Sequence, residues 1–259
     1  KGAGLYTRHR YRVRDGWQGV LVTTTLRNET KLKRKVKLRD TWTKFTSSGI
    51  AGDIHWADAV DPADKCGYAY RWEWKEGSKP GEIALSPGQE LNFDRFVAVG
   101  TSPLDAVGLI LQRAGNVDVV SGKLNGPGGK PVVTADITAT VNGKTLKGYP
   151  NEKGHFAFRM PQAEKHLLKV SDIGRDGIQL ELKADGKPAA VTLSADSAIA
   201  FDIRDAAGVS IPCKAQFNGA GDTPSPNLGP NNRAHGCLDQ YHSEKGRFRV
   251  AVPPGKYRV

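Results

Sequence analysis

The sequence is poor in sulfur. Its 259 residues include one methionine, Met160, and three cysteines, Cys66, Cys213 and Cys237. None of the cysteines has the C-x-x-C spacing, so the pattern excludes a disulfide framework and a cysteine-ligated metal site. Cys213 and Cys237 lie in the same segment and can pair in an oxidising compartment, and two buried free thiols are the alternative.

Long apolar runs are also missing. No apolar stretch approaches 18 residues, so no membrane span is predicted. The chain begins at Lys1 and not at methionine, so we expect a processed or cut piece whose signal peptide can have been lost upstream.

Sequence motifs of common catalytic centres are missing as well. The six histidines form no His-x-His pair, and the chain holds no G-x-S-x-G elbow and no phosphate-binding P-loop. Together these gaps favour a chain without its own catalytic centre, and no cofactor is expected. Paired carboxylates for glycoside cleavage stay possible, because such pairs come from distant positions.

The residues that are present favour an all-β fold. The chain has 30 Gly and 15 Pro, and short apolar runs with the period of a strand lie between turn dipeptides. Residues 17–28 and 31–40 flank Glu-Thr and are predicted to form an antiparallel pair. Further strands are predicted within 67–74 and 82–100. One helix is predicted after Ser102, with Ser102 as N-cap, Pro103 in the first turn and Gly115 at the exit.

A repeat occupies the second half of the chain. "EKGHFAFRMP" (152–161) returns as "EKGRFRVAVPP" (244–254), each inside a longer unit, 117–161 and 198–259. Gly154 and Gly246 are predicted to supply the positive φ of a tight hairpin. The apolar residues Phe156 and Phe158, and Phe248 and Val250 in the second copy, are then predicted to point to one buried face.

The repeat resembles the carboxypeptidase-regulatory, transthyretin-like β-sandwich module. That family has a G-x-P-V step in its opening and a later D/E-x-G-x-F-x-F strand that leads to P-x-G-x-Y. "GKPVV" and "EKGHFAF" match in the first copy, and "PPGKY" matches in the second, whereas the first copy has "PQAEKH" there. The resemblance implies one transthyretin-like module over 116–196 and a second, truncated one over 197–259. The composition shifts at the predicted helix, so we place a boundary near residue 115 and predict a β-sandwich over 1–115, in a multidomain all-β chain.

A second resemblance covers the order of the domains. The loop "GAGDTPSPNLGPNN" (219–232) before "PPGKYRV" is similar to the region upstream of the catalytic domain in CehA/McbA-type metallohydrolases of the PHP superfamily. Those proteins are secreted, so the resemblance implies an extracellular or periplasmic location. It also implies a downstream metal-dependent hydrolase domain, for which this chain would be a non-catalytic accessory scaffold.

Positive charge is concentrated at the N-terminus. Residues 1–50 hold 13 Lys/Arg against 3 Asp/Glu, whereas the whole chain has 38 against 27. Two predicted strands place cations on one face, and in adjacent strands those cations would form one surface. That surface would attract a polyanion such as a sulfated or uronic polysaccharide, or a lipid headgroup, or it is a solvated face that protects an edge strand. Nucleic acid is disfavoured, because cations and aromatic residues are not interleaved. The first strand contributes Arg8, Arg10, Arg12 and Arg14, and the second contributes Lys31, Lys33, Lys35, Lys37 and Arg39.

An aromatic row follows in "YAYRWEW". Tyr68, Tyr70, Trp72 and Trp74 share one side of the predicted strand. Exposed, they would form a stacking platform for sugar rings. Buried, they would form part of the sandwich core. The alternative function of the chain is therefore a carbohydrate- or polyanion-binding module built from this row and the basic strands.

A weak metal-site candidate lies in "GDIHWADAVD" (52–61). Carboxylate oxygens at this spacing can bind a hard cation such as Ca²⁺. A PHP-type site would need a second histidine, which alanine replaces, so an ordered polar loop that carries Trp56 is the alternative. The candidate ligands are Asp53, His55, Asp58 and Asp61, with Asp64 nearby.

Overall fold

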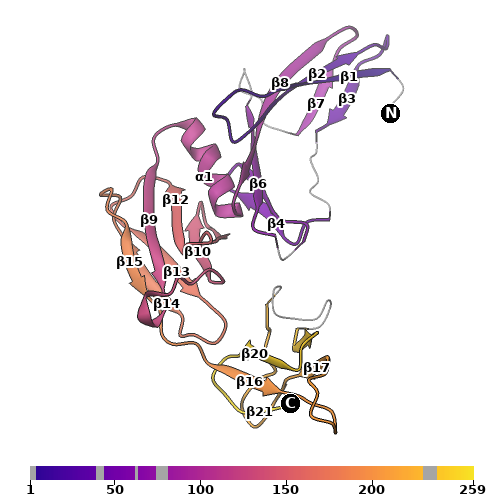
Figure 1. Cartoon of the computed structure of the whole chain (residues 1–259). Coiled ribbons are helices and arrows are strands. Elements are labelled where there is room, and N and C mark those ends of the chain that lie inside the picture. The colour runs from indigo at the N-terminus through magenta and orange to yellow at the C-terminus, as the bar shows by residue number, and fades with distance from the viewer. Residues whose placement is uncertain (1–3, 39–43, 62–63, 74–80, 230–237) are drawn as a thin grey trace. The chain divides into compact units, whose positions relative to one another are not determined.

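The computed structural model describes residues 4–38, 44–61, 64–73, 81–229 and 238–259. The described residues form many β-strands in several sheets, one α-helix and one short 3-10 turn (Figure 1). The predicted all-β, multi-sheet fold class is therefore confirmed.

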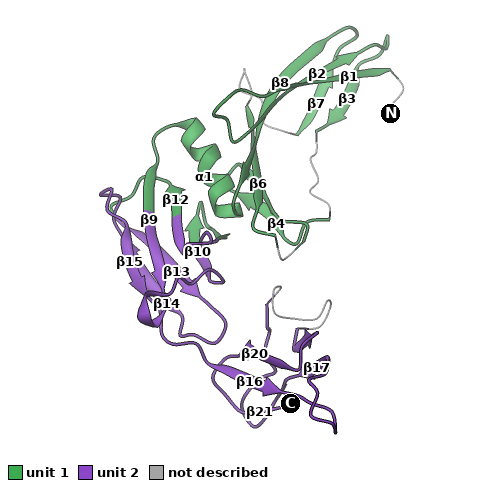
Figure 2. Cartoon of the chain, viewed as in Figure 1, with its two compact units in different colours: residues 1–120, 139–148, 157–164 green, residues 121–138, 149–156, 165–259 purple. Residues whose placement is uncertain are grey.

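The chain divides into two compact units (Figure 2). The first comprises residues 1–120, 139–148 and 157–164, and the second comprises residues 121–138, 149–156 and 165–259. The domain boundaries near residues 115 and 196 stay predictions.

A six-stranded antiparallel sheet forms most of the first unit. Cross-strand pairs share a face of the sheet. One face therefore carries Leu26, paired with Leu91, and the other carries Thr25, paired with Asn92. In spatial order the strands are β1 (Leu5–Arg12), β2 (Gly19–Asn28), β8 (Glu90–Gly100), β6 (Gly67–Glu73), β5 (Ile54–Asp58) and β4 (Ser48–Ala51).

The predicted pairing of 17–28 with 31–40 is wrong. β3 (Arg34–Lys37) pairs with β7 (Glu82–Leu85), whereas β2 lies between β1 and β8. Asn28, fully buried at the end of β2, provides the physical reason. Its amide donates to the carbonyls of Leu32 (2.8 Å) and Leu85 (2.9 Å), and its oxygen accepts from Thr30 (2.8 Å). These bonds hold the chain against β7 and so prevent a hairpin back onto β2.

The β3–β7 pair covers the Leu26 face of the large sheet. Leu26, Leu85 and Phe93 form a buried cluster, and partly buried apolar residues of β3 and β7 pack against it. Burial of these side chains drives the contact between the two sheets. We call this side of the six-stranded sheet the covered face.

The predicted helix is confirmed as α1 (Pro103–Ala114). The Ser102 hydroxyl accepts from the Asp105 backbone N–H, Pro103 opens the first turn, and Gly115 caps the end. The helix packs on the other face of the large sheet, where glycine permits close approach. A Cβ at Gly100 would lie 2.5 Å from the nitrogen of Ala106.

Seven strands from residues 118 to 192 form two sheets. The sheets pack closely, since a Cβ at Gly148 would lie 2.3 Å from the Phe158 ring. Phe156, Phe158 and Met160 are buried on one side of their strand, as the alternating pattern predicts. One sheet has the order β11 (Lys144–Gly148), β10 (Asp136–Val141), β13 (His166–Ser171), β14 (Ile178–Leu182). The other has β12 (His155–Met160), β9 (Asp118–Asn125), β15 (Ala189–Thr192). The 3-10 turn η1 (Pro127–Gly129) follows β9.

The C-terminal strands repeat this pairing scheme. β16 pairs with β20 as β9 pairs with β12, β17 pairs with β19 as β10 pairs with β11, and β18 pairs with β21 as β10 pairs with β13. Their core holds Phe217, Leu228, Val250 and Val252. The strand bounds are β16 (Ala198–Asp202), β17 (Cys213–Gln216), β18 (Asn218–Gly219), β19 (Gln240–Ser243), β20 (Arg247–Ala251) and β21 (Tyr257–Arg258). Cys213 has a free thiol, and Cys237 lies outside the described residues, so their pairing stays untested.

Backbone hydrogen bonds align the two copies residue by residue. Leu124 N–H donates to the Gly154 carbonyl (2.8 Å), and Ile203 N–H donates to the Gly246 carbonyl (2.8 Å). The isolated bridge between Asn125 and Pro131 returns between 204 and 210. Residues 118–132 therefore correspond to 197–211, and 154–160 correspond to 246–252.

The two repeated glycines share one role and differ in another. Gly154 has φ of +77°, as predicted, whereas Gly246 is not among the positive-φ residues, so that part of the prediction is wrong. Both positions also need close backbone approach. A Cβ would lie 2.5 Å from the Leu124 carbonyl oxygen at Gly154 and 2.1 Å from the Ile203 carbonyl oxygen at Gly246.

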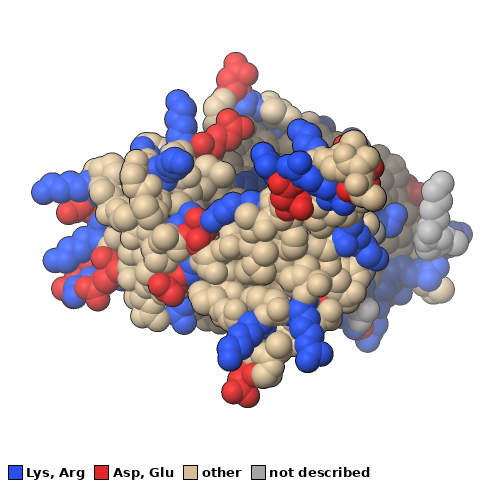
Figure 3. All heavy atoms as spheres, turned by 60° about the horizontal axis from the view of Figure 1, so that its bottom comes forward, with Lys and Arg blue, Asp and Glu red and all other residues tan. Residues whose placement is uncertain are grey.

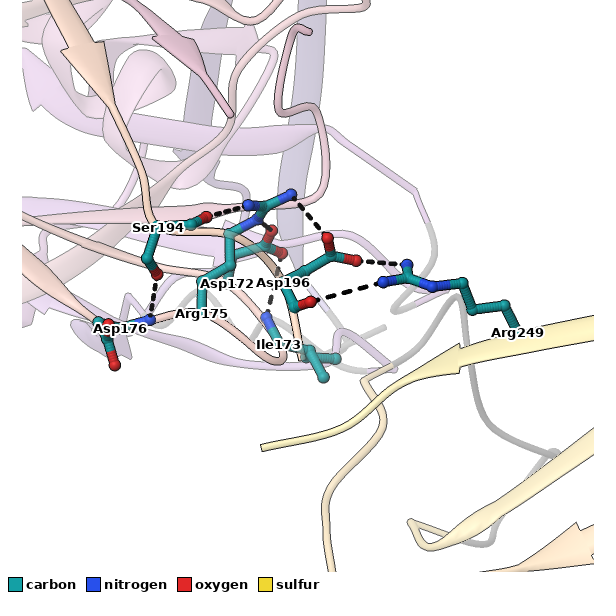
Figure 4. A network of polar contacts seen from close by, with 7 residues as sticks. All are labelled: Asp172, Ile173, Arg175, Asp176, Ser194, Asp196 and Arg249. Atoms are coloured by element: carbon teal, nitrogen blue, oxygen red, sulfur yellow. Dashed lines mark hydrogen bonds and ion pairs between the residues drawn. The ribbon is translucent and has the colours of Figure 1, made fainter. Parts of the chain in front are cut away.

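An ion-pair network joins the two copies within the second unit (Figure 4). The largely buried guanidinium of Arg175 contacts Asp172 (3.0 Å) and Asp196 (3.6 Å) and donates to the Ser194 carbonyl. Arg249 of β20 donates to the other oxygen of Asp196. This bond holds the pKa of Asp196 below its ordinary value. Asp196 thus links both copies through its two oxygens.

Candidate functional site

The aromatic row lies mainly in the core of the first unit. Tyr70 is 4% exposed and its ring stacks on His55, with 4.7 Å between centroids. Trp72 is partly buried against the cluster of the covered face, 5.1 Å from Phe93. A buried ring cannot stack on a sugar, so the structure favours the core alternative for these two residues. Trp74 lies outside the described residues.

Tyr68 is half-buried and has its own neighbours. Its ring meets that of Phe45 edge-on at 5.5 Å, and its hydroxyl oxygen lies 3.8 Å from the Cys66 sulfur, which donates to it. This hydrogen bond raises the pKa of Tyr68 above its ordinary value. These contacts hold the Tyr68 side chain against the protein, so it does not form part of a flat platform for sugar rings.

The two basic strands do not form one surface. β3, with Lys35 and Lys37, lies in the pair that packs on the covered face. The arginines of β1 pair with Thr25, Thr23 and Leu21 of β2, which are on the opposite face. The joint surface of nine cations is therefore a wrong prediction, because β1 and β3 belong to different layers. Lys31 and Lys33 are exposed before β3, and Arg39 lies outside the described residues.

The strand β1 presents a row of three arginines. Arg8, Arg10 and Arg12 are exposed on one face of this edge strand. Successive members are about 6.7 Å apart, since alternate residues of a strand share a face. We call this side of the six-stranded sheet the arginine face.

The middle of the arginine face is polar. Thr25 donates to Asn92 across β2 and β8 at 2.6 Å, beside Arg8 in register. The next row across the sheet contains Arg10, Thr23 and Asp94. The Thr23 hydroxyl thus lies beside Arg10, and the carboxylate of Asp94 lies one strand further on, so a hydroxyl group and both signs of charge occur on this face.

These three arginines differ from most others in the chain. In the part of the chain that the structure describes, Arg8, Arg10 and Arg12 have no carboxylate partner. Eight other arginines each lie beside a carboxylate: Arg27, Arg71, Arg113, Arg159, Arg175, Arg204, Arg247 and Arg249. The row on β1 therefore keeps its charge available for an anion from outside the chain.

A cluster of aromatic rings and two arginines lies beyond the end of the row, at the β1–β2 turn. Trp17 meets Phe96 edge-on at 5.6 Å, and the Arg14 and Arg113 guanidinium groups lie 5.3 Å and 5.5 Å from the Trp17 centroid. Arg113 is also bonded to Glu73 at 3.0 Å. Arg14 follows the end of β1 and contacts Trp17, so it is not part of the predicted row. The sequence offered no signal for this cluster, since Trp17 and Arg113 are 96 positions apart and meet only through the fold.

Elsewhere the charges are mixed. On the face that Figure 3 shows, lysine and arginine side chains lie among aspartate and glutamate side chains around an uncharged central area. Basic side chains do not gather into one continuous patch on that face. The unpaired row on β1 is thus a local feature and not a property of the whole surface.

The predicted metal ligands are not brought together. Asp53 is exposed, 4.0 Å from Arg71, whereas the His55 ring stacks on Tyr70. Asp58 is buried, and its carboxylate accepts from the Ala59 N–H at 2.9 Å. Asp61 and Asp64 are exposed. Across the described residues, no three His, Cys, Asp or Glu side chains gather as metal ligands could.

Comparison with known proteins identifies no family for this chain. No protein-family model matches the sequence. No curated protein matches it either. Among the helices of the described ranges, none is long and apolar enough to cross a membrane.

Two solved structures are weakly similar in shape. A polysaccharide lyase matches with a TM-score of 0.30 and 12% identity over 71% of this chain and 34% of its own. The TIE protein of Bacillus anthracis matches with a TM-score of 0.26 and 12% identity over 97% of this chain and 51% of its own. The chain therefore spans about a third and about half of the lengths of these two proteins.

Proposed function

We propose that this chain is a non-catalytic β-domain part of a larger secreted protein and that its arginine face binds an acidic polysaccharide. The observation that carries the proposal is the row of Arg8, Arg10 and Arg12, exposed and without a carboxylate partner among the described residues. A guanidinium binds carboxylate or sulfate through two parallel N–H bonds, and three in a row favour a ligand with repeated charges.

A polysaccharide fits the arginine face better than a nucleic acid does. Thr23 places a hydroxyl beside Arg10, which suits a ligand rich in hydroxyl groups. The aromatic side chains that would stack on bases lie in the core instead, as for Tyr70. The proposed ligand class is therefore a uronic or sulfated polysaccharide.

The role within a larger protein rests on the sequence resemblances. Two consecutive modules with the transthyretin-like motifs support a scaffolding role, because such modules are accessory in most proteins that carry them. The segment 219–259 resembles the region upstream of a CehA/McbA-type catalytic domain. The proposal is that a metal-dependent hydrolase domain of the same polypeptide acts on the bound polymer, outside the cell or in the periplasm.

Binding to defined polysaccharides tests the proposal. The chain is titrated with heparin, polygalacturonate and neutral dextran from low to high salt. The triple variant R8Q/R10Q/R12Q is compared with K33Q/K35Q/K37Q, which removes the same charge from the β3 side. We expect binding to heparin or polygalacturonate but not to dextran, a loss of about tenfold or more in the arginine variant only, and weaker binding at high salt.

Two results would overturn the proposal. An equal loss in both triple variants would mean that net charge alone attracts the polymer. Absence of binding to both acidic polymers at low salt would leave the arginine row as a solvated edge that only discourages strand pairing.

A further inference from the structure

The three cross-strand rows of the arginine face differ in the side chains that they offer to a ligand. Each row begins at an arginine of β1 and continues through β2 to β8. In the row of Arg8, Thr25 is 4% exposed and donates to Asn92 at 2.6 Å, and Asn92 in turn donates to Glu90 at 3.0 Å. The polar groups of this row are therefore already bonded to one another.

The row of Arg12 is apolar beyond its arginine. It continues through Leu21 and Phe96, which are 8% and 6% exposed. The Trp17 ring packs edge-on against Phe96, with 5.6 Å between the ring centroids. This row therefore offers a ligand one guanidinium group and no polar side chain of β2 or β8.

The row of Arg10 has polar groups that are not bonded. Thr23 and Asp94 are both half-buried and so keep part of their surface exposed. Within the described part of the chain, neither side chain has a hydrogen-bond or ion-pair partner. Glu73, opposite Asp94 on β6, is by contrast bonded to Arg113 at 3.0 Å. Of the three rows, this one leaves a hydroxyl group and a carboxylate available beside its arginine.

The chemistry of the Arg10 row restricts what can bind across it. Adjacent strands are about 4.8 Å apart, so the backbones of Arg10 and Asp94 are about 10 Å apart, with Thr23 between them. A guanidinium only donates hydrogen bonds, and an ionised carboxylate only accepts them. A ligand across this row must therefore place an anion at Arg10 and hydrogen-bond donors at Asp94. A densely sulfated sugar has anionic groups in place of its hydroxyls, and Asp94 would repel these groups.

We infer that the Arg10 row makes the arginine face select a uronic polysaccharide with free ring hydroxyls over a sulfated one. The inference rests on the proposed function, because it concerns the same face. Arg10 binds the carboxylate of a sugar, and Asp94 accepts hydrogen bonds from its hydroxyl groups. Arg8 and Arg12 bind the carboxylates of neighbouring sugars. The arginines thus supply the attraction to a polyanion, and Asp94 determines which polyanion is preferred.

Two forms of one polymer test the selection without a change of charge. Polygalacturonate and its O-acetylated form have the same carboxylates, whereas acetylation removes hydroxyl donors. Binding of the full chain to each form is measured by isothermal titration calorimetry at low salt. We expect the unmodified chain to bind the free form about tenfold more tightly, because hydrogen bonds to a charged group are stronger than those between neutral groups.

Asp94→Ala locates the selection in the Arg10 row. We expect this variant to bind both forms equally, because their hydroxyls no longer meet an acceptor, and to bind dextran sulfate more tightly than the unmodified chain does. Asp53→Ala is the matched control, since it removes the same charge from an exposed side chain between β4 and β5, and it should keep the tenfold preference. If Asp94→Ala unfolds, Asp94→Asn keeps the size of the side chain and should show a smaller preference.

The results separate this inference from the proposed function. Equal affinity of the unmodified chain for the two forms would overturn the selection alone, provided that R8Q/R10Q/R12Q still loses binding. A full preference that persists in Asp94→Ala would do the same, and so would arginine-dependent binding to heparin without binding to polygalacturonate. Absence of arginine-dependent binding to either polymer would overturn both.

Discussion

In the first copy of the module, Val120 and Phe156 are 1% and 4% exposed, whereas their counterparts Ile199 and Phe248 in the second copy are only half-buried. Both copies nevertheless have the same strand pairings and the same backbone bonds around the repeated glycine. The six described strands of the second copy thus keep the pairing scheme of the first, whereas in the first copy β14 and β15 add to the two sheets and their apolar residues help to cover the core.

The largest expected effect compares equivalent phenylalanines. Phe156→Ala should lower the free energy of unfolding by about 3–5 kcal/mol, because it leaves a cavity in a closed core. Phe248→Ala should cost about half of that, because its ring is already partly in water. Chemical denaturation of the two variants measures the difference, and equal losses would contradict the open core of the second copy.

The repeated glycine offers the next comparison. Gly154→Ala and Gly246→Ala should each cost about 1–3 kcal/mol, because the new Cβ meets a carbonyl oxygen in both. Gly208→Ala is the control, with φ of +83° and nothing within 4 Å of a Cβ. A cost at Gly246 no larger than at Gly208, measured by thermal unfolding, would remove close approach as the reason for the repeat.

The ion pair between Asp196 and Arg249 is absent from the first copy and should make the stability of the chain depend on pH. Arg249 holds the lowered pKa of Asp196, whereas Ala157 occupies the equivalent position in the first copy. A carboxyl with a lowered folded-state pKa stabilises the protein fully above its ordinary pKa of about 3.9 and less as the pH falls through the folded value. Asp196→Asn should therefore melt at a lower temperature than the unmodified chain at neutral pH, and the difference should disappear only once the pH has fallen below the lowered folded-state pKa of Asp196.

Melting temperatures across pH measure this difference. Arg249→Gln should behave like Asp196→Asn, because Arg249 is the main cause of the lowered pKa. A difference in melting temperature between Asp196→Asn and the unmodified chain that persists unchanged at low pH would contradict this prediction. It would show that the contribution of Asp196 to stability does not depend on its charge.

The smallest effect is expected on the surface of the second copy. Asp202 pairs with Arg247 and Arg204 at 3.0 Å and 2.9 Å, whereas Lys123 and His155 occupy the positions of Asp202 and Arg247 in the first copy. These bonds hold the pKa of Asp202 well below its ordinary range. The side chains are exposed, however, and solvent screens them. The double variant D202K/R247H should therefore melt at the same temperature as the unmodified chain, and a clear shift would give this pair a structural role.

The candidate site was only partly predictable from sequence. Alternation placed Arg8, Arg10 and Arg12 on one face of a strand, which the structure confirms. The same alternation could not show that β1 and β3 belong to different layers. Alternation shows which residues of one strand share a face. The neighbouring strands decide which of these faces lie on the same side of the sheet.

Local patterns by themselves determined the strands, the helix and the repeat. The signals around α1 are short-range: the Ser102 hydroxyl bonds three residues ahead, and Gly115 closes the last turn. The buried side of β12 also follows from alternation, since Phe156 and Phe158 must share a face. Such features depend on neighbours along the chain, and the sequence displays them directly.

Tertiary structure alone decided which strands pair and how closely their backbones approach. β3 joins β7 because the buried amide of Asn28 bonds to Leu32 and Leu85, 57 residues apart from Asn28 in the second case. Gly246 is needed for the approach of Ile203 and not for its own φ. Contacts between distant residues provide the free energy for these choices, and no periodicity in the sequence encodes which distant partner a strand will meet.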